Sequence, residues 1–103
     1  MTQPEKIEHI LNGGCEYFGF KRDDLTKEHG KGDKVWRPKT YLVIFLHKFT
    51  ILNNTEISKL LGYKHGTAVS YHIKKMKEEL SEDMYGCAKT KMIYNELLKY
   101  LGL

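Results

Sequence analysis

One stretch of the sequence, Leu60 to Met76, constrains the fold more than any other. It predicts a short helix that ends at Leu61, because Gly62 follows and supplies a tight turn. A second helix then opens near Thr67, and the Thr67 side chain is its expected cap. The segment therefore predicts two helices joined by a tight turn.

The second of these helices has two different faces. Apolar residues recur along one side and predict a continuous buried stripe: Val69, Ile73, Met76 and Leu80. The opposite side is rich in hydroxyl groups near its N-terminus and basic further along: Thr67, Tyr71, Lys74 and Lys75, with Ala68 and Ser70 at its edges. A helix, a turn and a second helix with a basic outer face are typical of a helix-turn-helix that binds double-stranded DNA.

The rest of the chain predicts more helices and no strand. Helices are expected over about residues 4–18, 38–50, 54–61, 67–82 and 84–101, with one helical turn at 23–27. The helix from Pro38 is the most apolar, so we expect it at the centre. Gly13 and Gly14 allow a break in the first helix, and Asn53 or Asn54 caps the third. We expect one compact all-α domain of about five helices over residues 1–103, since this length supports one core but not two.

Composition narrows the class of protein. The net charge of +4 fits a polyanionic partner, although many domains that bind no polyanion are equally basic. The N-terminus lacks the pattern of a signal peptide, and the longest apolar run, residues 41–46, is too short to cross a bilayer. Cys15 and Cys87 form no CxxC pair, so we expect reduced thiols in a cytoplasmic protein without a membrane partner.

Motifs of catalysis and cofactor binding are missing from the sequence. It contains no HExxH, no GxSxG and no GxxxxGK[ST] loop, and no two of its five histidines are three or four residues apart. We therefore expect no enzyme, no metal or other cofactor, and no nucleotide-binding module.

Three blocks of the sequence, taken in order, resemble the C-terminal DNA-binding domain (domain IV) of the bacterial replication initiator DnaA. The blocks are CEYFGFKRDDL at 15–25, VWRPKTYLVIFLHKFT at 35–50 and NTEISKLLGYKHGTAVSYHIKKM at 54–76. The resemblance implies a Trp-repressor-like helical fold and a stand-alone DnaA-like domain. It also implies binding of double-stranded DNA in replication initiation, in its regulation or in transcription, with replication or regulatory proteins as further partners.

The base-contacting motif of that family is Gly-Arg-Asp-His-Thr-Thr-Val, and the matching run here is Tyr63-Lys64-His65-Gly66-Thr67-Ala68-Val69. Most of the base-contacting positions differ, so the resemblance implies DNA binding without a preference for the family's usual site. The family's basic loop places an arginine in the minor groove. The loop here, about residues 27–34, has lysines instead, and we expect it to be mobile and to make a weaker contact through Lys31 or Lys34.

We therefore expect a DNA-binding site on the second helix of the motif, on the turn before it, on the basic loop and at the start of the central helix. Its expected residues are Lys31, Lys34, Arg37, Lys39, Lys64, His65, Gly66, Thr67, Ala68, Ser70, Tyr71, Lys74 and Lys75. The nearby His72 is expected to pack at the buried edge. The alternative function is a protein-interaction module that retains the helix-turn-helix without specific DNA binding, because a fold does not fix a function.

Overall fold

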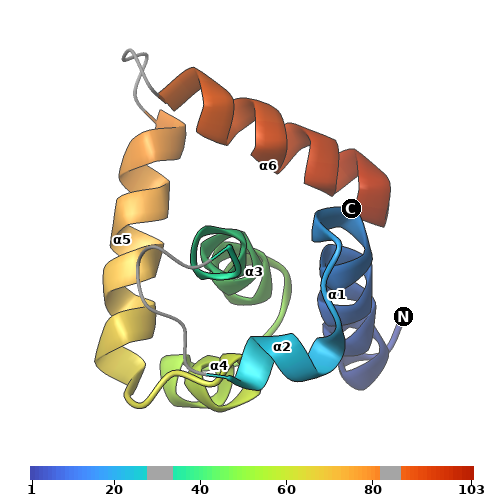
Figure 1. The fold of residues 1–103 in the computed structure, drawn as a ribbon, viewed down its shortest axis with the longest axis vertical. Helices are drawn as coiled ribbons and strands as arrows, with labels where there is room; N and C mark the ends of the chain where they lie inside the picture. Colours follow the sequence, from blue (N-terminus) through green and yellow to red (C-terminus); the bar gives the residue numbers. More distant parts are fainter. Residues whose placement is uncertain (28–33, 82–86) are drawn as a thin grey trace.

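The computed structural model describes residues 1–27, 34–81 and 87–103, and these residues form helices and no strand, as the sequence predicts. The helices are α1 (Gln3–Phe18), α2 (Arg22–Thr26), α3 (Trp36–Phe49), α4 (Asn54–Leu61), α5 (Gly66–Ser81) and α6 (Cys87–Leu101). In Figure 1, α3 is seen end-on at the centre, and α1, α4, α5 and α6 are arranged around it. None of the helices in the described ranges has the length and apolar character needed to span a membrane.

The central position of α3 follows from its sequence. Every residue from 39 to 46 is buried, so this helix has almost no solvent-facing side. Val43, Phe45 and Leu46 are completely enclosed. The same core contains side chains from the surrounding helices, including Leu11 of α1 and Leu97 of α6. Burial of so much apolar surface is the main stabilising contribution to a domain of this size.

The first helix is continuous through its two glycines, so the break that the sequence allowed does not occur. A Cβ atom on Gly13 would lie 2.3 Å from Cδ2 of Leu101, and one on Gly14 would lie 2.3 Å from Cδ2 of Leu42. The glycines therefore let α6 and α3 approach α1 closely. This close packing offsets the low helix propensity that a glycine pair has by itself.

The boundaries of α4 follow from its sequence. The Asn53 side chain accepts a hydrogen bond from the N–H of Glu56, and the Glu56 carboxylate accepts one from the N–H of Asn53. This reciprocal cap starts α4. The helix ends at Gly62, which has the left-handed φ of 72° that favours glycine. The N–H groups of Gly62 and Tyr63 both donate to the carbonyl of Ser58.

Two predicted boundaries need correction. The fifth helix already begins at Gly66, so Thr67 lies in its first turn and is not its cap. The carbonyl of His65 accepts a hydrogen bond from the N–H of Ala68 at this helix start. The central helix begins at Trp36 and contains Pro38 in its first turn, where proline is tolerated. The predicted start of the last helix near residue 84, and residues 28–33 of the predicted mobile loop, lie outside the described residues.

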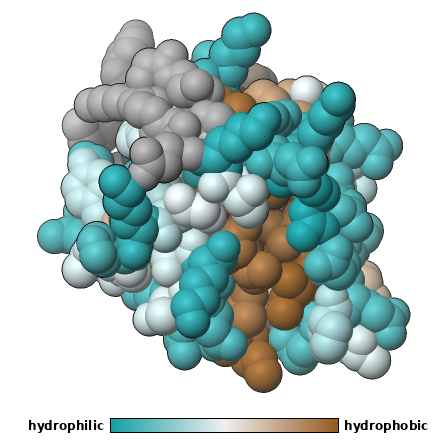
Figure 2. Space-filling model, turned by 60° about the horizontal axis from the view of Figure 1, so that its bottom comes forward, coloured by the Kyte–Doolittle hydropathy of each residue, from teal (hydrophilic) through white to brown (hydrophobic). Residues whose placement is uncertain are grey.

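The face at the bottom of Figure 1 carries a stripe of apolar side chains with hydrophilic side chains on both sides (Figure 2). Between α1 and α4 the surface forms a hollow of about 430 Å³. This hollow, called the apolar hollow below, is lined by three charged residues, Glu8, Glu56 and Lys59. Its four apolar lining residues are Pro4, Ile7, Leu52 and Leu60. Ile51, which precedes one of these residues in the chain, is 81% exposed.

Candidate nucleic-acid interface

The two helices of the predicted motif are joined directly by hydrogen bonds. Nδ2 of Asn54, at the start of α4, donates to Oγ of Ser70 in α5 at 2.7 Å. The Ser70 hydroxyl in turn donates to the carbonyl of Gly66 at 3.3 Å. Ser70 was predicted at the edge of the DNA-binding face, and in the structure its hydroxyl joins α5 to α4. Asn54 was predicted only as a possible cap, and no local sequence pattern indicates this contact with Ser70.

The turn between these helices has little room. A Cβ atom on Gly62 would lie 2.6–2.7 Å from three backbone atoms of Thr26, at the end of α2. Backbone atoms cannot move aside as easily as the end of a flexible side chain. The packing of α2 on the turn therefore requires glycine at this position.

The buried side of α5 agrees with the predicted stripe. Val69 and Met76 are fully buried and Ile73 is 7% exposed, whereas Leu80 is only partly buried. These side chains attach α5 to α3 and α4, because they belong to the common core. One side of α5 is thus committed to the interior, and the opposite side is left to the solvent.

The solvent side of α5 carries most of the predicted site. Thr67, Lys74 and Lys75 are exposed, Tyr71 is 56% exposed, and Ala68 is half-buried. In the turn before the helix, Lys64 and His65 are exposed, and Gly66, the first residue of α5, is half-buried. With the exposed Ser70, the structure therefore brings nine predicted residues to the first three turns of α5 and the residues just before them. Lys34 is exposed ahead of α3, and Lys31 lies outside the described residues.

An aromatic cluster supports this face from below. The ring of His72 is buried, as predicted, and its centroid lies 5.4 Å from those of Trp36 and Tyr63 and 5.6 Å from that of Tyr71. Burial lowers the pKa of His72 below its ordinary value, and the positive charges of two nearby residues, Arg37 and Lys39, lower it further. The imidazole beneath the exposed face is therefore neutral near pH 7.

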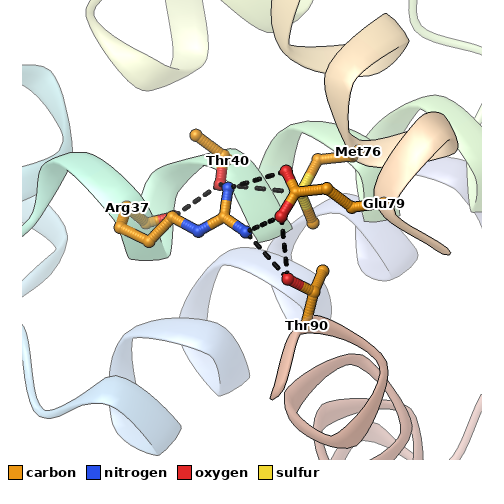
Figure 3. A network of polar contacts seen from close by, with 5 residues as sticks. All are labelled: Arg37, Thr40, Met76, Glu79 and Thr90. Atoms are coloured by element: carbon orange, nitrogen blue, oxygen red, sulfur yellow. Dashed lines mark hydrogen bonds and ion pairs between the residues drawn. The ribbon is translucent and has the colours of Figure 1, made fainter. Parts of the chain in front are cut away.

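Arg37, a predicted phosphate contact, is bound within the protein. Its Nη2 donates to Oε1 of Glu79 at 2.7 Å and to Oγ1 of Thr90 at 3.1 Å, and Thr90 donates to the same carboxylate oxygen at 2.8 Å (Figure 3). Thr40 and Met76 complete this group, in which the Thr40 hydroxyl donates to the Arg37 carbonyl at 2.6 Å. The network connects α3, α5 and α6, so Arg37 joins three helices while its side chain remains 40% exposed.

Lys39, the other predicted phosphate contact on α3, is not on the surface. Only 3% of the residue is exposed, and its Nζ lies 4.5 Å from the centroid of the Tyr63 ring. This is a cation–π arrangement in a desolvated setting. Burial also raises the pKa of Tyr63 well above its ordinary value, which keeps the hydroxyl protonated. Tyr63 is 24 residues from Lys39 in the sequence, so this pairing could not be recognised before the fold was known.

No protein-family model matches this chain, and a search of curated proteins finds no match. Among the residues that the structure describes, no group of three or more His, Cys, Asp or Glu side chains could hold a metal ion. The function is therefore argued from the geometry of α4 and α5 and from the chemistry of the exposed side of α5.

Proposed function

We propose that this protein binds double-stranded DNA through α4, the turn at Gly62 and α5, with α5 as the recognition helix in the major groove. The observation that carries the proposal is the division of α5 into two sides. Val69, Ile73 and Met76 hold one side in the core, and the other side presents small, hydroxyl and cationic groups to the solvent. A helix docked into a major groove needs this division, because it must be rigidly supported from behind.

The dimensions and order of the groups on α5 support the same proposal. The helix has 16 residues and is therefore about 24 Å long, and a major groove about 12 Å wide admits a helix. Thr67 lies near the N-terminal end, where a recognition helix approaches base edges. Lys74 and Lys75 follow two turns later and are placed to contact phosphates. Glu78 is exposed beyond them and would repel phosphates, so contact should end near the third turn.

The resemblance of three sequence blocks to the C-terminal domain of DnaA supports a more specific role. Within this proposal the protein acts in replication initiation, in its regulation or in transcription, and it works in the cytoplasm with other replication or regulatory proteins. The matched blocks end at Met76, within α5, and most positions equivalent to the family's base-contacting residues differ. The proposal therefore covers the mode of DNA binding and does not include the family's target sequence.

A charge-matched pair of variants tests DNA binding by this face. In one variant Lys74→Ala and Lys75→Ala remove two cations from α5. In the control, Lys89→Ala and Lys99→Ala remove two exposed cations from α6. Fluorescence anisotropy with a labelled duplex should show weaker binding for the α5 variant only. The slope of log K against log salt for this variant should be less negative than that of the unsubstituted protein by about 2, because two phosphate contacts are lost. Equal affinities for the two variants would contradict the proposed face.

The apolar stripe of Figure 2 favours a second candidate function, a protein-interaction module. The apolar hollow and the 81% exposed Ile51 are features of surfaces that bind other proteins. This candidate predicts an association that is nearly independent of salt and that is lost in the variant Ile51→Lys. A protein that binds duplex DNA with a steep salt dependence, and whose affinity is unchanged by Ile51→Lys, would instead support the DNA-binding proposal.

A further inference from the structure

We infer that α5 selects its DNA target mainly through the 5-methyl groups of thymines, which line the major groove beneath its first two turns. This inference rests on the DNA binding proposed above and adds the chemistry by which a target is chosen. Apolar contacts from Ala, from the methyl group of Thr and from aromatic rings are the means by which proteins recognise the thymine methyl group.

The first part of the argument is what the exposed side of α5 lacks. Bidentate recognition of guanine uses mainly Arg or Lys, and that of adenine uses Asn or Gln. Residues 66–77 contain no Arg, Asn or Gln. Asn54, on the neighbouring helix, donates to Ser70, and the Ser70 hydroxyl is also occupied by the carbonyl of Gly66. Arg37 is bound to Glu79 and Thr90. Asn54 and Arg37 are thus engaged within the protein, and the exposed Lys74 and Lys75 lie beyond the first two turns of α5.

The second part is what remains on this side. Thr67 presents a methyl group and a hydroxyl, Ala68 presents a methyl group, and Tyr71 presents a ring that is 56% exposed. Residues three and four apart on a helix are neighbours on its surface, so these three side chains form one patch. The ring of Tyr71 also contacts that of the buried His72 at a centroid distance of 5.6 Å. A supported aromatic ring beside two methyl groups is suited to apolar contacts with thymine methyl groups.

The cations lie at the margins of this patch. Lys74 is seven residues beyond Thr67, which corresponds to about 10 Å along the helix axis. A cation at that distance is placed for the phosphates that border the groove, and such contacts position a protein without selecting a sequence. Lys64 and His65 precede the helix on the other side of the patch. The apolar patch therefore lies where base edges are approached, between Lys64 and the lysines of the third helical turn.

Replacement of thymine by deoxyuridine tests the inference, because it removes the 5-methyl group and leaves base pairing intact. Duplexes that bind the full chain are first enriched from a random-sequence pool and sequenced. Thymines at the enriched positions are then replaced singly. We expect a roughly fourfold loss of affinity at each contacted thymine, the value for removing one methyl group from an apolar contact. Tyr71→Ala should weaken the thymine duplex and reduce this loss at one position.

Two controls separate the inference from the function on which it rests. Lys75→Ala should weaken the thymine and deoxyuridine duplexes by the same factor, because a phosphate contact is insensitive to the base methyl group. Duplex binding with no enriched thymines, or with unchanged affinity after every deoxyuridine replacement, overturns the inference and leaves DNA binding in place. No binding to any duplex in the pool at low salt overturns the proposed function together with the inference.

Discussion

The turn between α4 and α5 offers a sharp test of how the motif is held, because two glycines share a backbone conformation but differ in their surroundings. Gly62 and Gly19 have φ values of 72° and 83°. An added Cβ would lie 2.6–2.7 Å from backbone atoms of Thr26 at Gly62, whereas nothing lies within 4 Å of one at Gly19. Substitution of each by alanine therefore separates the conformational cost from the steric cost.

The expected magnitudes follow from these two costs. A left-handed conformation costs an L-residue about 1–2 kcal/mol, and this applies to Gly62→Ala and to Gly19→Ala alike. Overpacking against a neighbour that cannot move aside adds about 1–3 kcal/mol, and this applies to Gly62→Ala alone. For a domain of about this size, each kcal/mol lowers Tm by about 4–8 °C. Gly62→Ala should therefore melt at least about 4 °C below Gly19→Ala.

Urea unfolding followed by circular dichroism measures both variants against the unsubstituted protein. The free energy of unfolding should fall more for Gly62→Ala, with an unchanged dependence on urea if the native fold is kept. Equal losses for the two variants would refute the reasoning, because they would show that the approach of α2 to the turn does not constrain it. A smaller loss for Gly62→Ala than for Gly19→Ala would refute it even more directly.

Three further predictions concern the buried side of α5 and its polar links. Ile73→Ala should reduce the free energy of unfolding by about 2–4 kcal/mol, and a Tm shift below one degree would contradict its place in the core. The folded-state pKa of His72 is lower than its unfolded value of about 6.5, so the unfolded state binds more protons and stability should fall as pH decreases from 7 toward 5. Urea titrations at several pH values should show that His72→Phe removes part of this slope, and an unchanged slope in this variant would contradict the assignment. A double-mutant cycle on Arg37→Ala and Glu79→Ala should give a coupling free energy of up to about 1 kcal/mol, because the ion pair is partly exposed. A coupling free energy of zero would show that this ion pair does not stabilise the fold.

Local sequence signals predicted much of the fold. The apolar run at 41–46 indicated the central helix, Asn53 or Asn54 as a cap indicated the start of α4, and Gly62 indicated its end. Each of these features depends on residues close together in the chain, which is why each could be recognised. The alternation of buried and exposed residues along α5 was also correct, because helical periodicity is a local property.

Features that depend on distant residues could not be predicted in the same way. The sequence placed Arg37 and Lys39 among the phosphate contacts and did not indicate their internal contacts, because their partners Glu79 and Tyr63 are 42 and 24 residues away. The continuity of α1 through Gly13 depends on Leu101, at the other end of the chain. The exposed and buried sides of α5 could therefore be predicted from the sequence, whereas the internal contacts of Arg37 and Lys39 could not.

The measurement that tests the central claim most directly is a titration of the protein with a random-sequence duplex pool at several salt concentrations. Binding through α5 predicts that log K falls linearly with log salt, with a slope of about −0.9 for each phosphate that the protein neutralises. Two or more phosphate contacts, as the exposed Lys74 and Lys75 imply, would make the slope about −2 or steeper. No detectable binding at low salt, or an affinity that does not change with salt, would contradict the proposal that this helix-turn-helix binds DNA.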